Sequence, residues 1–482
     1  MDFGVIIKTL GKIILFEAAA LLPSLFIALY SGQGDFYAFL LSIIIIAAIG
    51  GLCLLSKPKK DAINYKEGFA IVGFGWILVT VLGALPFIFA GTFNSFIDAF
   101  FEAASGFSTT GATVLNDVEV LPKGILFWRS FTHWLGGMGI LVLALALLPA
   151  FKTGALQIYK AESPGPTPTK LVPRLGQTAQ LLYGIYILFT VVQVVLLFLA
   201  GMPLFEACVH TFGTVGTGGF STKNASIGAY NNVVFEVIIF FFMLVSGTNF
   251  TLHYQALHGN FKSLVKDSEF KFYIFVITAS ITAITLNLWN NIYINILEAL
   301  RHASFQVVSM ITTTGYATTN FDVWPSFSKI ILVILMLIGG CSGSTAGGIK
   351  QIRMLLLFKY AKREFSKLLH PKAVIPVRLG GKRVPEETLS GVVSFFFIHL
   401  IIFLIATLLI SFEGMDLVST VTSVVTALGN VGPGLGMVGP STNFGHLSAF
   451  SKTILSICMI MGRLEIYSIL ILISPGFWRR SY

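Results

Sequence analysis

Charged residues are scarce in this chain of 482 residues. Asp, Glu, Lys and Arg together make up 11% of it, whereas hydrophobic types make up 55% and the mean hydropathy is +0.83. A soluble domain carries about a quarter charged residues, so this composition excludes an ordinary soluble protein. The shortage of charge therefore indicates a membrane protein.

Residues that build metal or catalytic sites are also few. The four cysteines and eight histidines show no metal-ligand spacing, and the apolar spans contain no nucleophile paired with a base. The glycine-rich residues 213–219 lack the Gly-Lys-Ser/Thr ending of a phosphate-binding loop. We therefore predict that the chain is not an enzyme and holds no cofactor of its own.

The net charge of +10 could indicate nucleic-acid binding, but its distribution argues against this. Most of the Lys and Arg residues lie in alternate connections between apolar runs, for example ten of them between Lys350 and Arg383. This is the positive-inside pattern of a multi-pass membrane protein. The pattern predicts a plasma-membrane protein in a lipid bilayer, with both termini cytoplasmic and no nucleic-acid partner.

Apolar runs of about 20 residues, the length that crosses a bilayer core as a helix, recur along the chain. The first run is too long for a typical signal peptide and is predicted to be a retained helix. Ten spans are predicted, at residues 6–30, 37–55, 69–90, 126–150, 181–200, 233–253, 272–288, 328–360, 389–410 and 454–473.

Four segments between paired spans are neither long apolar helices nor ordinary polar loops, and each has a central glycine. These glycines are separated by 105, 99 and 117 residues, which indicates a fourfold internal repeat. The predicted ion-binding strands comprise Thr109, Thr110 and Gly111, then Thr214, Val215 and Gly216, then Thr313, Thr314 and Gly315, and finally Asn430, Val431 and Gly432.

Each segment follows a short amphipathic stretch. A helix of about ten residues covers only about 15 Å, so it can enter a bilayer and return but not cross it. Irregular backbone at that depth must be buried in protein or line a watery cavity. The sequence therefore predicts an all-α polytopic membrane protein in which four helix–pore loop–helix repeats surround one pseudo-fourfold pore. The predicted units are two N-terminal helices in residues 1–65 and repeats in residues 66–175, 176–268, 269–384 and 385–482.

The composition of the four segments suits a cation. A permeating cation must exchange its water shell for fixed oxygens, which rings of backbone carbonyls supply in potassium channels. Glycine permits the backbone angles that turn successive carbonyls inward, and threonine adds a hydroxyl oxygen. The C-terminal end of each short helix also carries partial negative charge. Glu102 and Glu206 lie in these short helices, where they can either attract cations or brace the helices.

The sequence resembles the Trk/Ktr/HKT superfamily of potassium transporters over nearly its whole length, and most closely the TrkH branch. The resemblance rests on the four strands, the stretch from Gly339 to Lys350, and the sequence Met461-Gly462-Arg463. It implies potassium uptake across the plasma membrane, with the potassium ion as substrate. It also implies a homodimer and a cytoplasmic TrkA-like regulatory subunit that carries a nucleotide of the NAD or ATP type.

Within the family, glycine in the first repeat accompanies potassium and serine accompanies sodium, so Gly111 implies potassium. The fourth repeat departs from the pattern because it has Asn430 and Pro433 in place of threonine and tyrosine. Proline restricts the backbone of the residue before it. We call the four predicted ion-binding strands together the selectivity filter. Its fourth strand is therefore predicted to differ in shape from the others, and the selectivity for potassium over sodium is predicted to be modest.

The eighth predicted span is long for one crossing and contains five glycines between positions 339 and 348. Such an insert should break the helix at mid-membrane, either as a flexible kink or as the gate that the family resemblance implies. Arg463 is an intramembrane charge, which usually marks a pathway, and is predicted to project into the pore below the filter. The predicted gate residues are Gly339, Gly340, Cys341, Ser342, Gly343, Ser344, Thr345, Ala346, Gly347, Gly348 and Arg463.

An alternative function is a potassium symporter with alternating access, coupled to sodium or protons. Such transporters are often built from inverted repeats and broken helices. Each repeat here begins on the predicted cytoplasmic side, which favours the channel-like pore.

Overall fold

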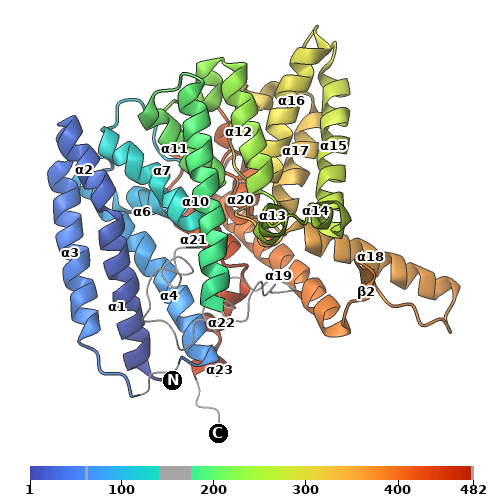
Figure 1. The fold of residues 1–482 in the computed structure, drawn as a ribbon, viewed down its shortest axis with the longest axis horizontal. Coiled ribbons are helices and arrows are strands. Elements are labelled where there is room, and N and C mark those ends of the chain that lie inside the picture. The colour runs from blue at the N-terminus through green and yellow to red at the C-terminus, as the bar shows by residue number, and fades with distance from the viewer. Residues whose placement is uncertain (60–62, 140–174, 479–482) are drawn as a thin grey trace.

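The computed structural model of the protein describes residues 1–59, 63–139 and 175–478. These residues are almost entirely helical, which confirms the predicted fold class (Figure 1). The strands β1 (Arg378–Leu379) and β2 (Lys382–Arg383) pair as one small antiparallel hairpin.

Six of the ten predicted spans are helices long and apolar enough to cross a membrane. Three contain one principal helix each, namely α3 (Phe36–Leu54), α10 (Leu175–Leu199) and α15 (Ser268–Leu288). The others are α1 (Phe3–Ala20) with α2 (Leu22–Ser31), α4 (Tyr65–Gly83) with α5 (Leu85–Phe89), and α19 (Glu386–Ile410) with the short turn that follows it. The start of α1 and the helix α23 (Pro475–Trp478) lie at the same end of the bundle (Figure 1).

The two N-terminal spans pack against each other through glycines. A Cβ atom on Gly11 of α1 would lie 2.9 Å from the carbonyl oxygen of Gly50 and 2.7 Å from the Cβ atom of Cys53, both on α3. The reverse contact is similar, since a Cβ atom on Gly50 would lie 3.1 Å from the carbonyl oxygen of Gly11. Small residues at such positions let two membrane helices approach closely.

Four short helices enter the bundle without crossing it. They are α6 (Phe96–Phe107), α11 (Leu204–Val215), α16 (Ile296–Ile311) and α20 (Leu417–Gly429). Polar side chains begin three of them, because Ser95, Asn295 and Asp416 accept hydrogen bonds from backbone N–H groups of the first turn. We call these four the pore helices. An irregular strand follows each of them.

The helix that follows each strand is also short. These second helices are α7 (Lys123–Gly137), α12 (Val233–Ser246), α17 (Ser326–Ile338) and α21 (Ala449–Arg463). Beyond its end, α12 turns by 101° into α13 (Phe250–Leu257), and α21 turns by 117° into α22 (Tyr467–Ile473). The unbroken spans predicted at residues 233–253 and 454–473 are therefore wrong.

The two unpredicted bends have different causes. After α12, the side chain of Asn249 accepts a hydrogen bond of 2.9 Å from the Thr251 N–H and so starts a new helix. After α21, Glu465 and Ile466 adopt left-handed backbone angles, with φ of 51° and 66°. Such angles are rare for residues other than glycine and reverse the chain direction.

The break predicted between positions 339 and 348 is confirmed. Helix α17 ends at Ile338, and the chain resumes as α18 (Gln351–Leu369) only after an irregular loop, which we call the glycine loop. The single crossing predicted for residues 328–360 is wrong in its second half. Helix α18 carries several Lys and Arg residues and projects away from the bundle with the β1–β2 hairpin before α19 returns (Figure 1). The second part of the span predicted at residues 126–150 lies outside the described residues.

We predict that Gly11→Val destabilises the N-terminal helix pair. The added side chain would collide with backbone and Cβ atoms of α3, and such overpacking typically lowers the free energy of unfolding by about 1–3 kcal/mol. Thermal unfolding of the detergent-purified protein measures the effect. Gly51→Val is the matched control, because a Cβ atom on Gly51 has no neighbour within 4 Å. An equal loss of stability in both variants would contradict the proposed packing.

Candidate ion pore

The strand after each pore helix repeats one backbone conformation. A residue with φ of 55–56° begins each strand and a glycine with φ between 80° and 101° follows two positions later. The first set is Thr109, Thr217, Thr313 and Asn430, and the second is Gly111, Gly219, Gly315 and Gly432. The residue between them donates its N–H to a carbonyl five residues earlier in the pore helix, over 2.8, 2.7, 2.9 and 3.0 Å in chain order.

The structure corrects the predicted strand of the second repeat. Gly216 caps α11 with an ordinary helical φ of −74°, and the hydroxyl of Thr214 donates to the carbonyl oxygen of His210 within that helix over 2.7 Å. The glycine equivalent to Gly111 is Gly219. The Thr-Val-Gly sequence at 214–216 has the same Thr-x-Gly pattern as residues 217–219, so the backbone conformation, with positive φ at Thr217 and Gly219, is what identifies the correct strand.

The four glycines form a closed ring. A Cβ atom on any of them would lie within 1.9–2.7 Å of a carbonyl oxygen in the next repeat. The contacts run from Gly111 to Gly218, from Gly219 to Thr314, from Gly315 to Val431, and from Gly432 back to Thr110. Because every link joins equivalent positions, the strands surround one axis in the order of the sequence. All four glycines also line one open cavity at the mouth of this ring.

The fourth strand departs from the other three. Gly432 has the largest φ of the four glycines, 101°, and its contact with Thr110 is the loosest, at 2.7 Å. Asn430 replaces a threonine, and its Nδ2 donates to the Thr110 hydroxyl over 3.1 Å and to the carbonyl oxygen of Met459 over 2.8 Å. The backbone pattern survives because asparagine tolerates left-handed angles better than most residues.

The glycine loop lies directly against one end of the ring. The N–H of Gly347 donates to the hydroxyl of Thr313 over 2.7 Å, and a Cβ atom on Gly347 would lie 2.5 Å from the carbonyl oxygen of Gly429. The loop therefore contacts the strands of the third and fourth repeats. Along this loop only Gly343 is fully exposed, and most of the other residues are buried.

The broken end of α12 holds the same loop. Cys341 N–H donates to the carbonyl oxygen of Gly247 over 2.9 Å, and the Thr345 N–H donates to that of Ser246 over 3.3 Å. In return, the carbonyl oxygen of Gly343 accepts from Phe250 N–H at the start of α13, over 2.9 Å. The carbonyl groups that the end of α12 leaves unpaired are thus satisfied by the glycine loop.

Arg463, at the end of α21, connects the glycine loop to the first repeat. Its Nη1 donates to the carbonyl oxygen of Thr345 over 2.7 Å, and its Nη2 donates to that of Gly136 over 2.5 Å and also to that of Gly137. Glu465, two residues further on, forms an ion pair with Arg353 of α18. The loop and Arg463 therefore join the C-terminal ends of all four second helices.

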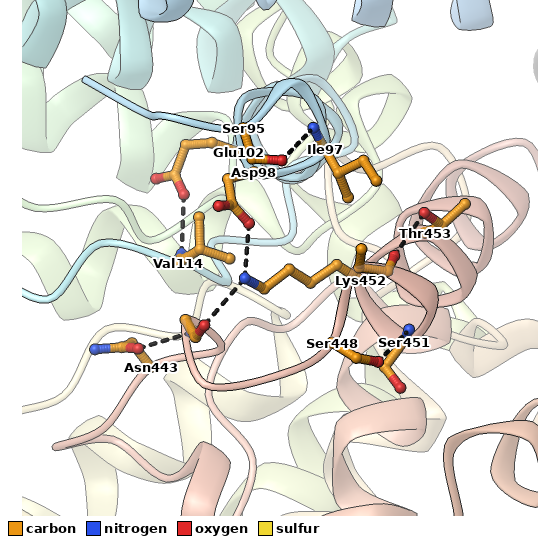
Figure 2. Close-up of polar contacts among 12 residues, drawn as sticks. Ser95, Ile97, Asp98, Glu102, Val114, Asn443, Ser448, Ser451, Lys452 and Thr453 are labelled. Carbon is orange, nitrogen blue, oxygen red and sulfur yellow. Dashed lines mark hydrogen bonds and ion pairs between the residues drawn. The ribbon is translucent and has the colours of Figure 1, made fainter. Parts of the chain in front are cut away.

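Charged side chains brace the first pore helix. Lys452 of α21 donates to Asp98 over 2.7 Å and to the carbonyl oxygen of Gly445 over 3.0 Å (Figure 2). One turn further along α6, Glu102 accepts the N–H of Val114 over 3.1 Å (Figure 2). Glu102 is fully buried and its carboxylate bonds to the strand that follows the helix, while its role as a brace of the helix stays a prediction. Among the described residues, no group of three or more His, Cys, Asp or Glu could hold a metal ion.

Comparison with known proteins agrees with this architecture. The sequence model of TrkH, a cation transport protein family, matches residues 36–479. The chain is 43% identical to the Trk system potassium uptake protein TrkH of Salmonella typhimurium and 42% identical to that of Escherichia coli K12, over 99% of this chain and 100% of each relative. The crystal structure of the potassium transporter TrkH from Vibrio parahaemolyticus superposes with a TM-score of 0.89 at 37% identity, covering 99% of this chain and 100% of that one. The chain therefore belongs to the TrkH family of cation transport proteins.

Proposed function

We propose that this chain takes up potassium across the plasma membrane through a gated, channel-like pore. The closed ring of four glycine-centred strands carries the proposal, because it sets equivalent backbone groups of four repeats around one axis. Relatives that share more than 40% of the sequence along the whole chain are named potassium uptake proteins, which supports potassium as the ion.

Oxygen atoms without partners support a cation site in the ring. The Thr109 hydroxyl and the Asn430 Oδ1 are buried and have no hydrogen-bond partner among the described residues. Unpaired buried oxygens are costly, and a cation or water molecule would satisfy them. The four pore helices end at this level, so their partially negative C-terminal ends also favour a cation. Backbone carbonyls of the ring would complete its coordination.

The glycine loop and Arg463 are the proposed gate. They fill the inner side of the ring with hydrogen-bonded backbone and one positive charge. Ion passage requires the loop to leave Thr313 and Arg463 to leave the end of α7. An inside-negative potential favours cation entry by about 2.3 kcal/mol per charge per 100 mV, so no catalytic residue is needed.

The pore is proposed to work as a homodimer controlled by a cytoplasmic TrkA-like subunit that binds NAD or ATP. The two termini and the basic helix α18 with its hairpin would face the cytoplasm, in keeping with the positive-inside pattern. Arg353 at the start of α18 forms an ion pair with Glu465, two residues beyond Arg463, so α18 is linked to the proposed gate through Glu465. A partner that moves α18 would therefore act on Arg463.

The proposed function predicts ion uptake that is driven by a membrane potential. Liposomes containing the purified protein should accumulate rubidium, a potassium mimic, when an inside-negative potential is imposed, and external potassium should compete better than sodium. Uptake that requires a sodium or proton gradient would instead favour the coupled symporter. Protein-free liposomes are the control.

A second prediction tests the corrected register of the filter. Thr109→Val should lower the ratio of rubidium to sodium uptake by about tenfold, since the loss of one hydrogen-bonding ligand is worth roughly 1.4 kcal/mol. The matched control is Thr214→Val, whose hydroxyl donates only within its own helix over 2.7 Å and should leave the ratio unchanged. A loss of selectivity in Thr214→Val as large as that in Thr109→Val would restore the originally predicted strand of the second repeat.

A third prediction concerns the gate. Arg463→Ala should raise rubidium flux at least about tenfold, the effect of removing about 1.4 kcal/mol from a barrier, because it removes both a charge and the link to α7. Deletion of residues 343–346 should also raise flux, and the combined variant should gain less than the product of the two. A slower flux in properly assembled Arg463→Ala protein would show that Arg463 assists conduction.

A further inference from the structure

A buried ion pair lies behind the first two strands of the ring. Nε of Arg129, on α7, lies 2.5 Å from Oε1 of Glu102, on α6, and the two side chains are 3% and 0% exposed. Two charges are rarely buried this deeply without a specific role, since removing them from water is costly. The proposed ion pathway does not itself require either charge.

Glu102 holds the first strand. Its carboxylate accepts the hydroxyl of Thr113 over 2.9 Å and the N–H of Val114 over 3.1 Å. These residues lie two and three positions beyond Gly111, where the strand leaves the ring. Hydrogen bonds to a carboxylate are stronger than those between neutral groups, so they fix this segment firmly.

Arg129 holds the second strand. Its Nη1 donates to the carbonyl oxygen of Ser221 over 3.2 Å, and its guanidinium carbon lies 3.6 Å from the centre of the Phe220 ring. Phe220 and Ser221 lie one and two positions beyond Gly219. The Glu102–Arg129 pair is therefore a continuous link between equivalent points of two neighbouring strands.

Among the described residues, the other repeats have no charged link at the equivalent position, nine residues before the ring glycine. The His210 ring contacts the hydroxyl of Ser221 over 3.0 Å, and the hydroxyl of Tyr316 in the third repeat donates to the carbonyl oxygens of His210 and Phe220 over 3.0 and 3.1 Å, so the second and third strands are joined by neutral groups alone. Both amide atoms of Gln306 are buried without a partner among the described residues, and Ser423 donates only to Thr420 of its own helix over 2.8 Å. The charged link is thus confined to the first and second strands.

We propose that the Glu102–Arg129 pair is a positioning element that sets the preference of the pore for potassium over sodium. It holds two adjacent strands at a fixed separation, so the ring cannot contract around the smaller ion on that side. Because the two charges cancel, the link adds no net charge beside the ion pathway. This inference rests on the proposed function.

The test measures rubidium and sodium uptake in liposomes for Glu102→Gln, Arg129→Gln and the double variant. Each single variant should lower the rubidium-to-sodium ratio by about tenfold or more, as expected when hydrogen bonds to a charged group are lost. The double variant should be no worse than the worse single variant, because both remove the same link.

The direction of the flux distinguishes positioning from simple electrostatics. Glu102→Gln leaves a positive charge near the filter and Arg129→Gln leaves a negative one, so an electrostatic role predicts opposite changes in total cation flux. A positioning role predicts the same loss of selectivity in both. Opposite flux changes with an unaltered uptake ratio would overturn the proposal.

Glu236→Gln is the matched control. Glu236 of α12 accepts two hydrogen bonds from Arg301 of α16, over 2.6 and 2.7 Å, but neither residue bonds to a ring strand. Its rubidium-to-sodium uptake ratio should equal that of the wild type. If the ratio falls as far as in the Glu102 and Arg129 variants, the Glu102–Arg129 pair only stabilises the protein in general.

Gel filtration shows whether the single variants assemble. If they do not, the uptake ratio of Thr113→Val decides between the two roles, because this variant removes the hydroxyl that donates to Glu102 and leaves both charges in place. A wild-type uptake ratio in Thr113→Val would then overturn the inference. Absence of potential-driven flux in the wild-type protein would instead refute the proposed function itself.

Discussion

The structure depends on one constraint, which is that backbone polar groups at membrane depth must be satisfied within the protein or by water and ions. The strands meet it by the same hydrogen bond in all four repeats, from the residue before each ring glycine to its pore helix. The glycines then place each strand against a carbonyl of the next, where a Cβ atom would find no room. The ring is thus the arrangement in which each irregular strand bonds to its own pore helix and packs closely against the next strand.

The same constraint applies at the C-terminal ends of the second helices, where the proposed gate lies. Each second helix ends within the bundle and leaves carbonyl groups without helical partners. Those of α7 accept from Arg463, and those of α12 accept from the glycine loop. In the gate that we propose, these carbonyl groups would be paired within the protein in the closed state and with water in an open state.

Local sequence signals predicted the features that local residues determine. The glycine-centred repeats and the break after Ile338 follow from composition within a few positions. The bend after α21 could not be predicted in this way, because the ion pair beside it joins Glu465 to Arg353, which is 112 residues away. The second filter strand was misplaced because the sequence Thr-Val-Gly fits both a helix end and a filter strand. The backbone conformation, with positive φ at Thr217 and Gly219, resolves that ambiguity.

The backbone of the ring is nearly fourfold, but the side chains around it are not. A charged pair joins the first and second strands, whereas the glycine loop contacts the third and fourth through Thr313 and Gly429. Movement of the loop therefore changes the surroundings of the half of the ring that has no charged link. In the pore that we propose, one part of the ring would move while another would hold its dimensions. Sequence divergence between the repeats permits this division, which four identical repeats could not provide.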